Sequence, residues 1–333
     1  MQSTFNSFNL LNRVKLNINI LSNPFGFEMN DLFLLGARVN PKRSFLFISK
    51  LLGKHLAVHP DIPKLSGHLL ANLFANEAEH TYVSDVDVLV NAVKTGNITQ
   101  KVKQELAKQL PLSQEVLFLG FAETATGLGH AVFSAFQNAY YVHTTREHFI
   151  DRQSIFDFEE EHSHATEHLC YLKDKTMLKK VSYIVLIDDE ITTGNTCLNL
   201  IRSLNEIYPG KQYTILSLLD WRTEKHQKDY DEFCNKYELN IKTFSLLRGT
   251  IELVKNHVFH YPGISFESLV DDNPKSYQLI YESFGEKVEV MKEQGAYEEC
   301  LLGTGRFGLS SIDAENIEEE AKRIGQHLQK IRK

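Results

Sequence analysis

The sequence predicts an α/β fold in which a parallel sheet is flanked by helices. Two segments, 116–136 and 183–204, each combine an apolar strand, a loop of small or hydroxylated residues, and a helical pattern. Residues 213–219 and 241–247 also have the character of buried strands, and 224–237 between them is typical of a helix. Strands that alternate with helices form parallel sheets, because each crossover helix returns the chain to the same end of the sheet.

The segment 183–196 joins adjacent carboxylates to a hydroxyl-rich loop. Asp188 and Asp189 follow the apolar run, and the loop leads into a helical pattern that begins at Cys197. Free N–H groups and the dipole at a helix N-terminus favour phosphate, and threonine hydroxyls can donate further hydrogen bonds. Carboxylates at the carboxyl end of a strand can accept hydrogen bonds from a diol or hold hydrated Mg²⁺. The pattern therefore indicates a site for a phosphorylated ribose.

This segment closely resembles the 5-phosphoribosyl-1-diphosphate (PRPP) motif of type I phosphoribosyltransferases, in which two acidic residues precede a Thr-Thr-Gly-x-Thr loop. The resemblance implies the fold of that family, a parallel sheet flanked by helices and covered by a hood. It also implies that Asp188 and Asp189 are catalytic, face the ribose hydroxyls and bind Mg²⁺, directly or through water. The implied binding residues for the 5-phosphate are Glu190, Ile191, Thr192, Thr193, Gly194, Asn195 and Thr196.

A second small-residue loop follows the strand at 116–121, and a helical pattern continues from Ala131. Gly127 and Gly129 would let backbone N–H groups approach a diphosphate, although a purely structural turn explains the loop equally well. In type I phosphoribosyltransferases the loop after the first core strand binds diphosphate. The resemblance thus implies diphosphate binding by Glu123, Thr124, Ala125, Thr126 and Gly127.

Residues 139–146 are interpreted as another strand, and a long polar stretch from 147 to 180 follows it. A connection of this length predicts a lid. Type I phosphoribosyltransferases carry a mobile hood that closes over the active site and excludes water. Arg146 and Arg152 are the candidates to clamp the departing diphosphate, since a guanidinium matches phosphate geometry.

Within this stretch, acidic residues and histidines cluster between 159 and 168. His164 and His168 are four residues apart and would share a helix face, so that Glu160 or Glu161 could complete a transition-metal site. Substrate contact or acid/base chemistry by His162 or His164 is a second interpretation, and a solvated lid surface is a third. No cysteine-rich partner supports zinc.

Four basic residues surround an apolar strand expected within 32–50. They are either ordinary surface charges or a basic wall beside a polyanionic substrate. Together with four other segments, this one resembles the orotate-phosphoribosyltransferase-like group of tellurium-resistance (Ter) gene clusters, over roughly residues 30–250. The segments are Asn40-Pro41-Lys42-Arg43, Ser49-Lys50, Leu52-Gly53-Lys54-His55, Gly120–Gly129 and Glu160–Ala165.

The Ter-group resemblance implies a role in making a nucleoside-like metabolite. Purine-specific relatives place an acidic base three residues after the acidic pair, whereas this chain has Thr192 there. An orotate-like or unusual base is therefore expected as the acceptor. Possible substrate-binding residues are Lys42, Arg43, His162 and His164.

The chain of 333 residues is expected to comprise an N-terminal extension (1–30), a phosphoribosyltransferase-like domain (31–250, hood about 145–180) and a partly helical, α or α+β appendage (251–333). A formal net charge of -7 argues against nucleic-acid binding. Four scattered cysteines predict reduced thiols in a cytoplasmic protein, and no stretch resembles a membrane span or signal peptide. A homodimer is expected by resemblance.

Two functions follow from these features. The first is a Mg²⁺-dependent phosphoribosyltransferase that transfers phosphoribose from PRPP to a small-molecule base with release of diphosphate, or runs the reverse reaction on a nucleotide. The alternative is a non-catalytic regulatory protein that binds PRPP or a nucleotide. A long lid rich in titratable groups favours the enzyme.

Overall fold

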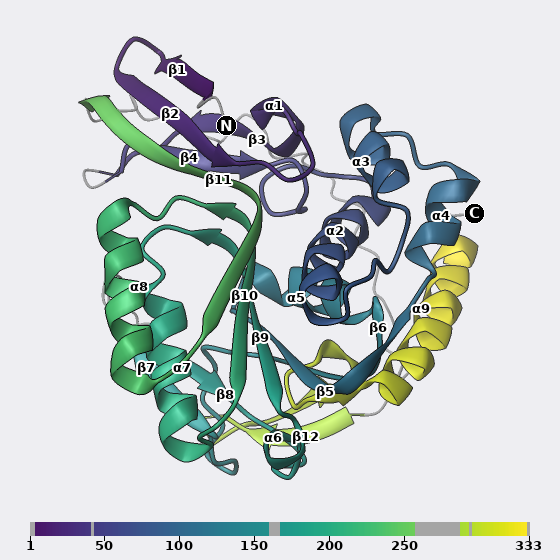
Figure 1. The fold of residues 1–333 in the computed structure, drawn as a ribbon. Helices are drawn as coiled ribbons and strands as arrows, with labels where there is room; N and C mark the ends of the chain where they lie inside the picture. The colour runs from purple at the N-terminus through teal and green to yellow at the C-terminus, as the bar shows by residue number, and fades with distance from the viewer. Residues whose placement is uncertain (1–3, 41–42, 160–166, 257–286, 293–294, 332–333) are drawn as a thin grey trace.

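The computed structural model describes residues 4–40, 43–159, 167–256, 287–292 and 295–331. These residues form a mixed α/β structure around an eight-stranded sheet with the strand order β1-β2-β11-β10-β9-β5-β6-β14 (Figure 1). Within the described ranges, three two-stranded sheets lie outside it. None of the helices in these ranges has the length and hydropathy to cross a bilayer.

The five central strands of the large sheet run parallel. They pair as β11-β10-β9-β5-β6, and the register places Leu119 opposite Leu186 and Ile187 opposite Leu216. Their bounds are β5 (Leu110–Gly120), β6 (Phe136–His143), β9 (Tyr183–Ile191), β10 (Gln212–Asp220) and β11 (Ile241–Asn256). The parallel sheet predicted from the alternation of strands and helices is thus confirmed, and the carboxyl ends of β5 and β9 lie next to each other.

Helices cover both faces of the parallel strands, because alternate side chains of each strand point to opposite faces. On one face Phe118 and Val185 pack with α2 and α5; on the other Leu119 and Leu186 pack with α6, α7 and α8 (Figure 1). The helices are α2 (Asp61–Ala78), α5 (Ala125–Phe133), α6 (Met177–Lys180), α7 (Asn195–Ile207) and α8 (Glu224–Tyr237). This arrangement leaves the strand ends as the place where loops can form a site.

Local sequence signals set several helix ends. The Asp85 carboxylate accepts a hydrogen bond from the Val88 N–H and caps α3 (Val86–Thr95), which ends at Gly96 in the left-handed region (φ 71°). Thr99 caps α4 (Gln100–Leu106) in the same way as Asp85.

Segments from both ends of the chain extend the sheet. The hairpin of β1 (Thr4–Leu10) and β2 (Val14–Ser22) pairs antiparallel with β11, and Val14, Leu16 and Ile18 are fully buried there. At the opposite edge β14 (Leu309–Ser310) pairs with β6 and leads into α9 (Ser311–Ile331).

The single strand expected within 32–50 is in fact a hairpin. After α1 (Met29–Leu32), strands β3 (Phe33–Ala37) and β4 (Phe45–Ser49) pair antiparallel, with Ala37 opposite Phe45. The Asn-Pro pair at 40–41 favours chain reversal, which the apolar content alone did not reveal. The hairpin packs beside the carboxyl end of β10, since the Phe47 ring stacks on Trp221, the residue after this strand, with centroids 4.8 Å apart.

The stretch after β6 contains strands where a helix was expected. β7 (Phe156–Glu159) pairs antiparallel with β8 (Glu167–Cys170), so His168 lies in a strand. The prediction that His168 lies on a helix, on the same face as His164, is therefore wrong for His168. The alternation of apolar and polar residues at 156–159 has the two-residue period of a strand. His168 is buried, with its Nδ1 3.0 Å from the Thr144 hydroxyl oxygen. Glu160, Glu161, His162 and His164 lie outside the described residues.

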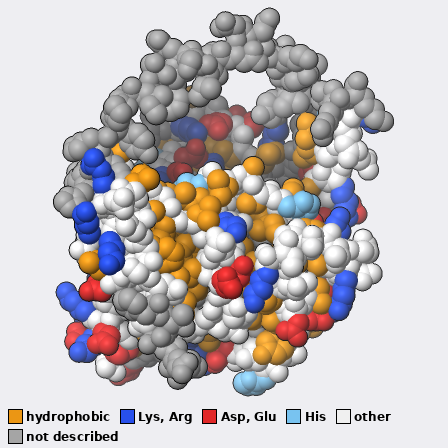
Figure 2. Space-filling model, turned by 90° about the horizontal axis from the view of Figure 1, so that it is seen from above, with side chains coloured by type: hydrophobic (Ala, Val, Ile, Leu, Met, Phe, Trp, Pro, Cys, Tyr) orange, Lys and Arg blue, Asp and Glu red, His pale blue; other side chains and the backbone are white. Residues whose placement is uncertain are grey.

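A further hairpin lies beside this stretch. It consists of β12 (Lys287–Met291) and β13 (Tyr297–Leu301), and the short 3₁₀ helix η2 (Leu302–Thr304) follows. Seen from above, the molecule shows a hollow in which acidic and basic side chains lie close together, next to a band of exposed apolar side chains (Figure 2).

Candidate functional site

The hydroxyl-rich loop predicted as a phosphate site lies between β9 and α7. β9 ends at Ile191 and α7 begins at Asn195, so Thr192, Thr193 and Gly194 form the turn. Gly194 has a φ of 84°, and a Cβ there would lie 2.2 Å from the Tyr230 hydroxyl oxygen. Only glycine satisfies both restrictions, which explains its place in the loop.

A cavity of about 380 Å³ opens between this loop and the loop after β5. It brings together the carboxylates of Asp188 and Asp189, the cation Arg146 and two residues of the second loop, Glu123 and Thr124. The remaining wall is formed by Phe121, Ala122, Glu190, Ile191, Thr192, Thr193, Gly194, Asn195, Thr196 and Cys197. The two loops predicted to bind the ends of PRPP therefore face a common space.

Other candidate residues lie outside this wall. Ala125, Thr126 and Gly127 are not among its residues, and neither are Arg43 and Arg152. The Arg152 guanidinium instead donates to the Glu289 carbonyl oxygen at 3.2 Å and lies 5.6 Å from the Phe307 ring centroid. Lys42, His162 and His164 fall outside the described residues.

The second loop is shorter than the sequence suggested, because α5 begins at Ala125 and not near Ala131. Gly127 and Gly129 therefore lie within a helix. A Cβ on Gly129 would lie 2.9 Å from the Tyr141 ring and 3.1 Å from the Gly120 Cα, so this glycine allows α5 to pack closely on the sheet. Gly129 thus has a packing role, and its predicted approach to a diphosphate stays a prediction.

The acidic run at the end of β9 is held in a partly buried, like-charged environment. Asp188 and Asp189 are both half-buried, and the Asp188 carboxylate accepts a hydrogen bond from the Asp189 N–H at 2.8 Å. Burial, reinforced by the negative charge of Asp189, raises the pKa of Asp188 well above its usual range. Burial also raises the pKa of Glu190, against the opposing effect of Arg43.

Two cations from the N-terminal third of the chain reach this acidic run. Arg43 Nη2 lies 2.7 Å from Glu190 Oε1, and its guanidinium lies 4.7 Å from the centroid of the Phe45 ring. Lys54 Nζ lies 3.5 Å from Asp189 Oδ2. Lys54 was not among the predicted site residues, although the segment Leu52-Gly53-Lys54-His55 carried part of the Ter-group resemblance and could have indicated it.

A buried polar layer supports the loop from the α8 side. The Tyr230 hydroxyl donates to the Gly194 carbonyl oxygen at 2.9 Å, and the Arg222 guanidinium lies 4.2 Å from the Tyr230 ring centroid. Arg222 in turn donates to both oxygens of Asp220, at 3.0 and 2.8 Å. Asp220, Arg222 and Tyr230 are nearly inaccessible to solvent. Sequence reasoning missed all three, because Tyr230 meets Gly194 only in the folded chain, 36 residues away, and nothing in the sequence marks Asp220 and Arg222 as buried.

The donor set suits a hard divalent cation. Mg²⁺ in phosphate-binding sites typically takes one or two carboxylates, with substrate phosphates and water as its other ligands, and Asp188 and Asp189 provide such carboxylates. Among residues with described positions, no group of three or more His, Cys, Asp or Glu side chains is arranged to hold a metal ion.

The family model described as phosphoribosyl transferase matches residues 32–250. The chain belongs to the phosphoribosyl transferase family. The matched range includes both cavity loops, the acidic run and Arg146. The chain is thus a phosphoribosyltransferase, as its sequence motif predicted, and it has the sheet flanked by helices that the motif implied.

Solved structures of phosphoribosyltransferases also show similarity to the chain. Adenine phosphoribosyltransferase from Trypanosoma brucei, in complex with AMP, pyrophosphate and ribose-5-phosphate, is 14% identical, with 69% of this chain and 83% of that chain covered and a TM-score of 0.41. The enzyme from Leishmania donovani is 13% identical, with coverages of 69% and 83% and a TM-score of 0.39. UMP synthase from Leishmania donovani is 14% identical, with coverages of 65% and 34% and a TM-score of 0.31. A search of curated protein sequences gives no match.

Proposed function

We propose that this phosphoribosyltransferase uses PRPP and Mg²⁺, and transfers phosphoribose to a small-molecule base or runs the reverse reaction on a nucleotide. The supporting observation is the cavity itself, in which the hydroxyl-rich loop before α7, the Asp188–Asp189 pair and Arg146 face one another. This set offers a phosphate site, diol acceptors and a cation in one cavity.

Each group has a role in this scheme. Residues 190–196 bind the 5-phosphate through backbone N–H groups and hydroxyls at the start of α7. Asp188 and Asp189 accept hydrogen bonds from the ribose hydroxyls and hold Mg²⁺, directly or through water. Glu123 and Thr124, with the first turn of α5 (125–127), receive the diphosphate, and Arg146 neutralises it.

The reaction separates charge, since bond breaking at C1 of PRPP leaves positive charge on the ribose and negative charge on the diphosphate. Arg146 is placed to stabilise the departing anion, and the carboxylates orient the ribose. Bound Mg²⁺ would supply Lewis-acid stabilisation of the phosphate oxygens.

We further propose an acidic, orotate-like base as the acceptor, in line with the Ter-group resemblance and its link to nucleoside-like metabolites. Thr192 stands where purine-specific relatives place an acidic residue. The cation Arg43, held beside Glu190 by the β3–β4 hairpin, supports an anionic acceptor, and Lys42, His162 and His164 are candidates for further contacts.

Calorimetric titration of PRPP tests the proposal directly. Wild type should bind PRPP in the presence of Mg²⁺ and lose that binding in EDTA. Asp188→Asn/Asp189→Asn should abolish it, whereas Asp229→Asn, an exposed carboxylate on α8, serves as the matched control. Absence of PRPP binding to wild type contradicts the proposed substrate. Tight binding with no diphosphate release across a panel of bases favours the regulatory alternative.

A homodimer is also proposed, with α9 of the two copies packed antiparallel. Ala321, Ile324 and Leu328 recur at intervals of three and four residues, the spacing of a coiled-coil seam, and Leu328 is 48% exposed, whereas Ile317 packs against the core of its own chain. The first half of α9 is rich in glutamate and the second half in lysine and arginine, so antiparallel copies have complementary charges. Sedimentation should show a dimer that Leu328→Glu dissociates and the neighbouring Gln329→Glu does not.

The compartment proposed is the cytoplasm. All four cysteines are free in the structure, and three of them are buried. Free buried thiols suit a reducing environment. Fractionation of cells that produce the protein should place it with cytoplasmic enzymes.

A further inference from the structure

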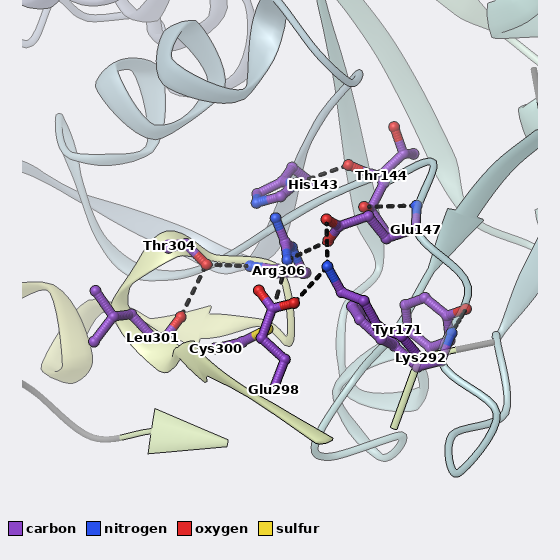
Figure 3. A network of polar contacts seen from close by, with 12 residues as sticks. His143, Thr144, Glu147, Tyr171, Lys292, Glu298, Cys300, Leu301, Thr304 and Arg306 are labelled. Atoms are coloured by element: carbon purple, nitrogen blue, oxygen red, sulfur yellow. Dashed lines mark hydrogen bonds and ion pairs between the residues drawn. The ribbon is translucent and has the colours of Figure 1, made fainter. Parts of the chain in front are cut away.

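An ion-pair network joins the connection after β6 to the C-terminal hairpin. Glu147 lies directly after Arg146, and its carboxylate binds Arg306 Nη1 at 2.5 Å and Lys292 Nζ at 3.2 Å (Figure 3). Lys292 also binds Glu298 at 2.5 Å. We call Glu147, Lys292, Glu298 and Arg306 the clasp.

The clasp is more than a pair of exposed charges. Glu147 uses one oxygen for each cation, and the Arg306, Lys292 and Glu147 side chains are only 24%, 33% and 38% exposed. Isolated surface ion pairs contribute little to stability, but partly shielded networks fix geometry because several contacts must break together. The clasp therefore restricts the position of Glu147.

Backbone contacts reinforce the same junction. The Ile150 N–H donates to the Met291 carbonyl oxygen at 2.9 Å, and the Lys173 N–H donates to the Phe307 carbonyl oxygen at 2.9 Å. The rings of Phe149 and Phe307 pack with centroids 5.7 Å apart. The C-terminal segment, residues 287–292 and 295–310 in the described part, thus contacts the connection at several points.

Arg146 lies between two fixed neighbours as a result. On one side, the Thr145 N–H donates to the Leu169 carbonyl oxygen at 2.8 Å and the Leu169 N–H donates back at 2.9 Å. On the other side, Glu147 is held by the clasp. The side chain between them lines the candidate active-site cavity.

We propose that Arg306 and Lys292 are positioning residues that hold Arg146 in the cavity wall through Glu147. Both cations lie beyond residue 250, where the family match ends. The C-terminal segment would therefore complete the PRPP site from outside the region that matches the family model, residues 32–250. The kinetic consequence rests on the proposed function, whereas the restraint on Arg146 does not.

The first experiment measures the restraint without a substrate. Hydrogen exchange in the full chain should be faster across residues 145–152 in Arg306→Gln than in wild type, and unchanged there in Arg323→Gln. Arg323 is the matched control because it forms an ion pair with Glu320 on α9, away from the clasp. Unchanged exchange across residues 145–152 in Arg306→Gln overturns the proposal whatever the enzyme's substrate.

The second experiment asks whether the restraint acts through Arg146. Arg306→Gln should raise the KM for PRPP about tenfold, because small displacements of a clamping group weaken its action strongly. The same substitution should have no further effect in an Arg146→Gln background. A purely structural role predicts instead a lower Tm with an unchanged KM, or independent effects in the double variant, and either result overturns the proposal.

A charge exchange provides a third readout. Glu147→Arg alone should impair PRPP use, and Glu147→Arg/Lys292→Gln/Arg306→Glu should recover part of it, because the ion pair between positions 147 and 306 is restored with reversed polarity and no lysine faces the new arginine. Failure of the exchange to recover any activity, with normal folding, counts against the clasp. If wild type itself binds no PRPP, the proposed function fails. The hydrogen-exchange measurement needs no substrate, so it still decides whether the clasp restrains residues 145–152.

Discussion

The Tyr230 hydroxyl donates a 2.9 Å hydrogen bond to the carbonyl oxygen of Gly194. This contact links α8 to the loop proposed to bind the 5-phosphate. Behind it, the Arg222 guanidinium packs against the Tyr230 ring and binds Asp220. The loop thus rests on a buried layer, and residues that do not line the cavity can affect ligand binding.

Replacing Tyr230 tests this support. Tyr230→Phe keeps the ring and removes the hydroxyl, which leaves the buried Gly194 carbonyl without this donor. Loss of one such bond is worth about 1 kcal/mol, so PRPP should bind about five- to tenfold more weakly in calorimetry. Tyr237→Phe, farther along the same helix, is the control. Unchanged affinity in Tyr230→Phe would show that the loop keeps its shape without this contact.

Gly194 should be intolerant of any side chain. Gly194→Ala combines a positive φ with a Cβ 2.2 Å from the Tyr230 hydroxyl, whereas Gly210→Ala has a similar φ of 80° and open space around its Cβ. Gly210→Ala should therefore lower the free energy of unfolding by about 1 kcal/mol. Gly194→Ala should lower it further and abolish PRPP binding. If urea unfolding gives equal decreases in the free energy of unfolding for Gly194→Ala and Gly210→Ala, the clash with Tyr230 is relieved at little energetic cost.

The two candidate arginines should differ in their effect on turnover. Arg146 lines the cavity, whereas Arg152 is engaged with Glu289 and Phe307 outside it. Arg146→Gln should lower kcat on the order of a hundredfold, the usual effect of removing a donor from a developing anion. Arg152→Gln should cause a much smaller loss. Steady-state assays of diphosphate release would distinguish the two, and comparable losses would place Arg152 in the reaction.

The stability of the protein should decrease as the pH is lowered, because the His68 side chain is buried. Burial, assisted by the charge of Lys64, lowers the pKa of His68 to about 3. Below pH 6.5 the unfolded chain can protonate this side chain and the folded chain cannot, so stability is retained above that pH and lost as the pH falls. Between pH 7 and pH 5 the loss should be about 2 kcal/mol.

Urea unfolding at the two pH values provides the measurement. In His68→Leu, the decrease in the free energy of unfolding between pH 7 and pH 5 should be about 2 kcal/mol smaller than in wild type. His55→Leu, at an exposed site, should show the same decrease as wild type. An identical pH dependence in His68→Leu would show that other groups account for acid destabilisation.

The parts of the site that sequence reasoning predicted are those whose signal is local. The run from Tyr183 to Thr196 contains a strand, its carboxylates and a helix start in one continuous stretch, so its structure followed from residue types alone. The strands at 213–219 and 241–247 and the helix at 224–237 were predicted for the same reason. Each is confirmed by β10, β11 and α8.

The parts that were missed depend on residues far apart in the chain. Gly129 resembled a loop glycine, but its small size serves the packing of α5 against Tyr141 and Gly120. Arg43 and Glu190 were both predicted site residues, but their ion pair was not predicted, because 147 residues separate them; 159 residues separate Arg306 from Glu147. In sequence these charges look like any surface charge. Only the folded sheet and its neighbouring hairpins show which of them meet.

The antiparallel pairing of β14 with β6 has a consequence for shortened versions of the protein. Ser310 and Leu309 cover the outer side of Tyr140 and Tyr141. A chain cut at residue 250 would lack β14, so β6 would be an unprotected edge strand whose unpaired peptide groups could pair with a strand of another molecule. Such a fragment would tend to aggregate. A lack of activity in the fragment would therefore not test the chemistry of the cavity.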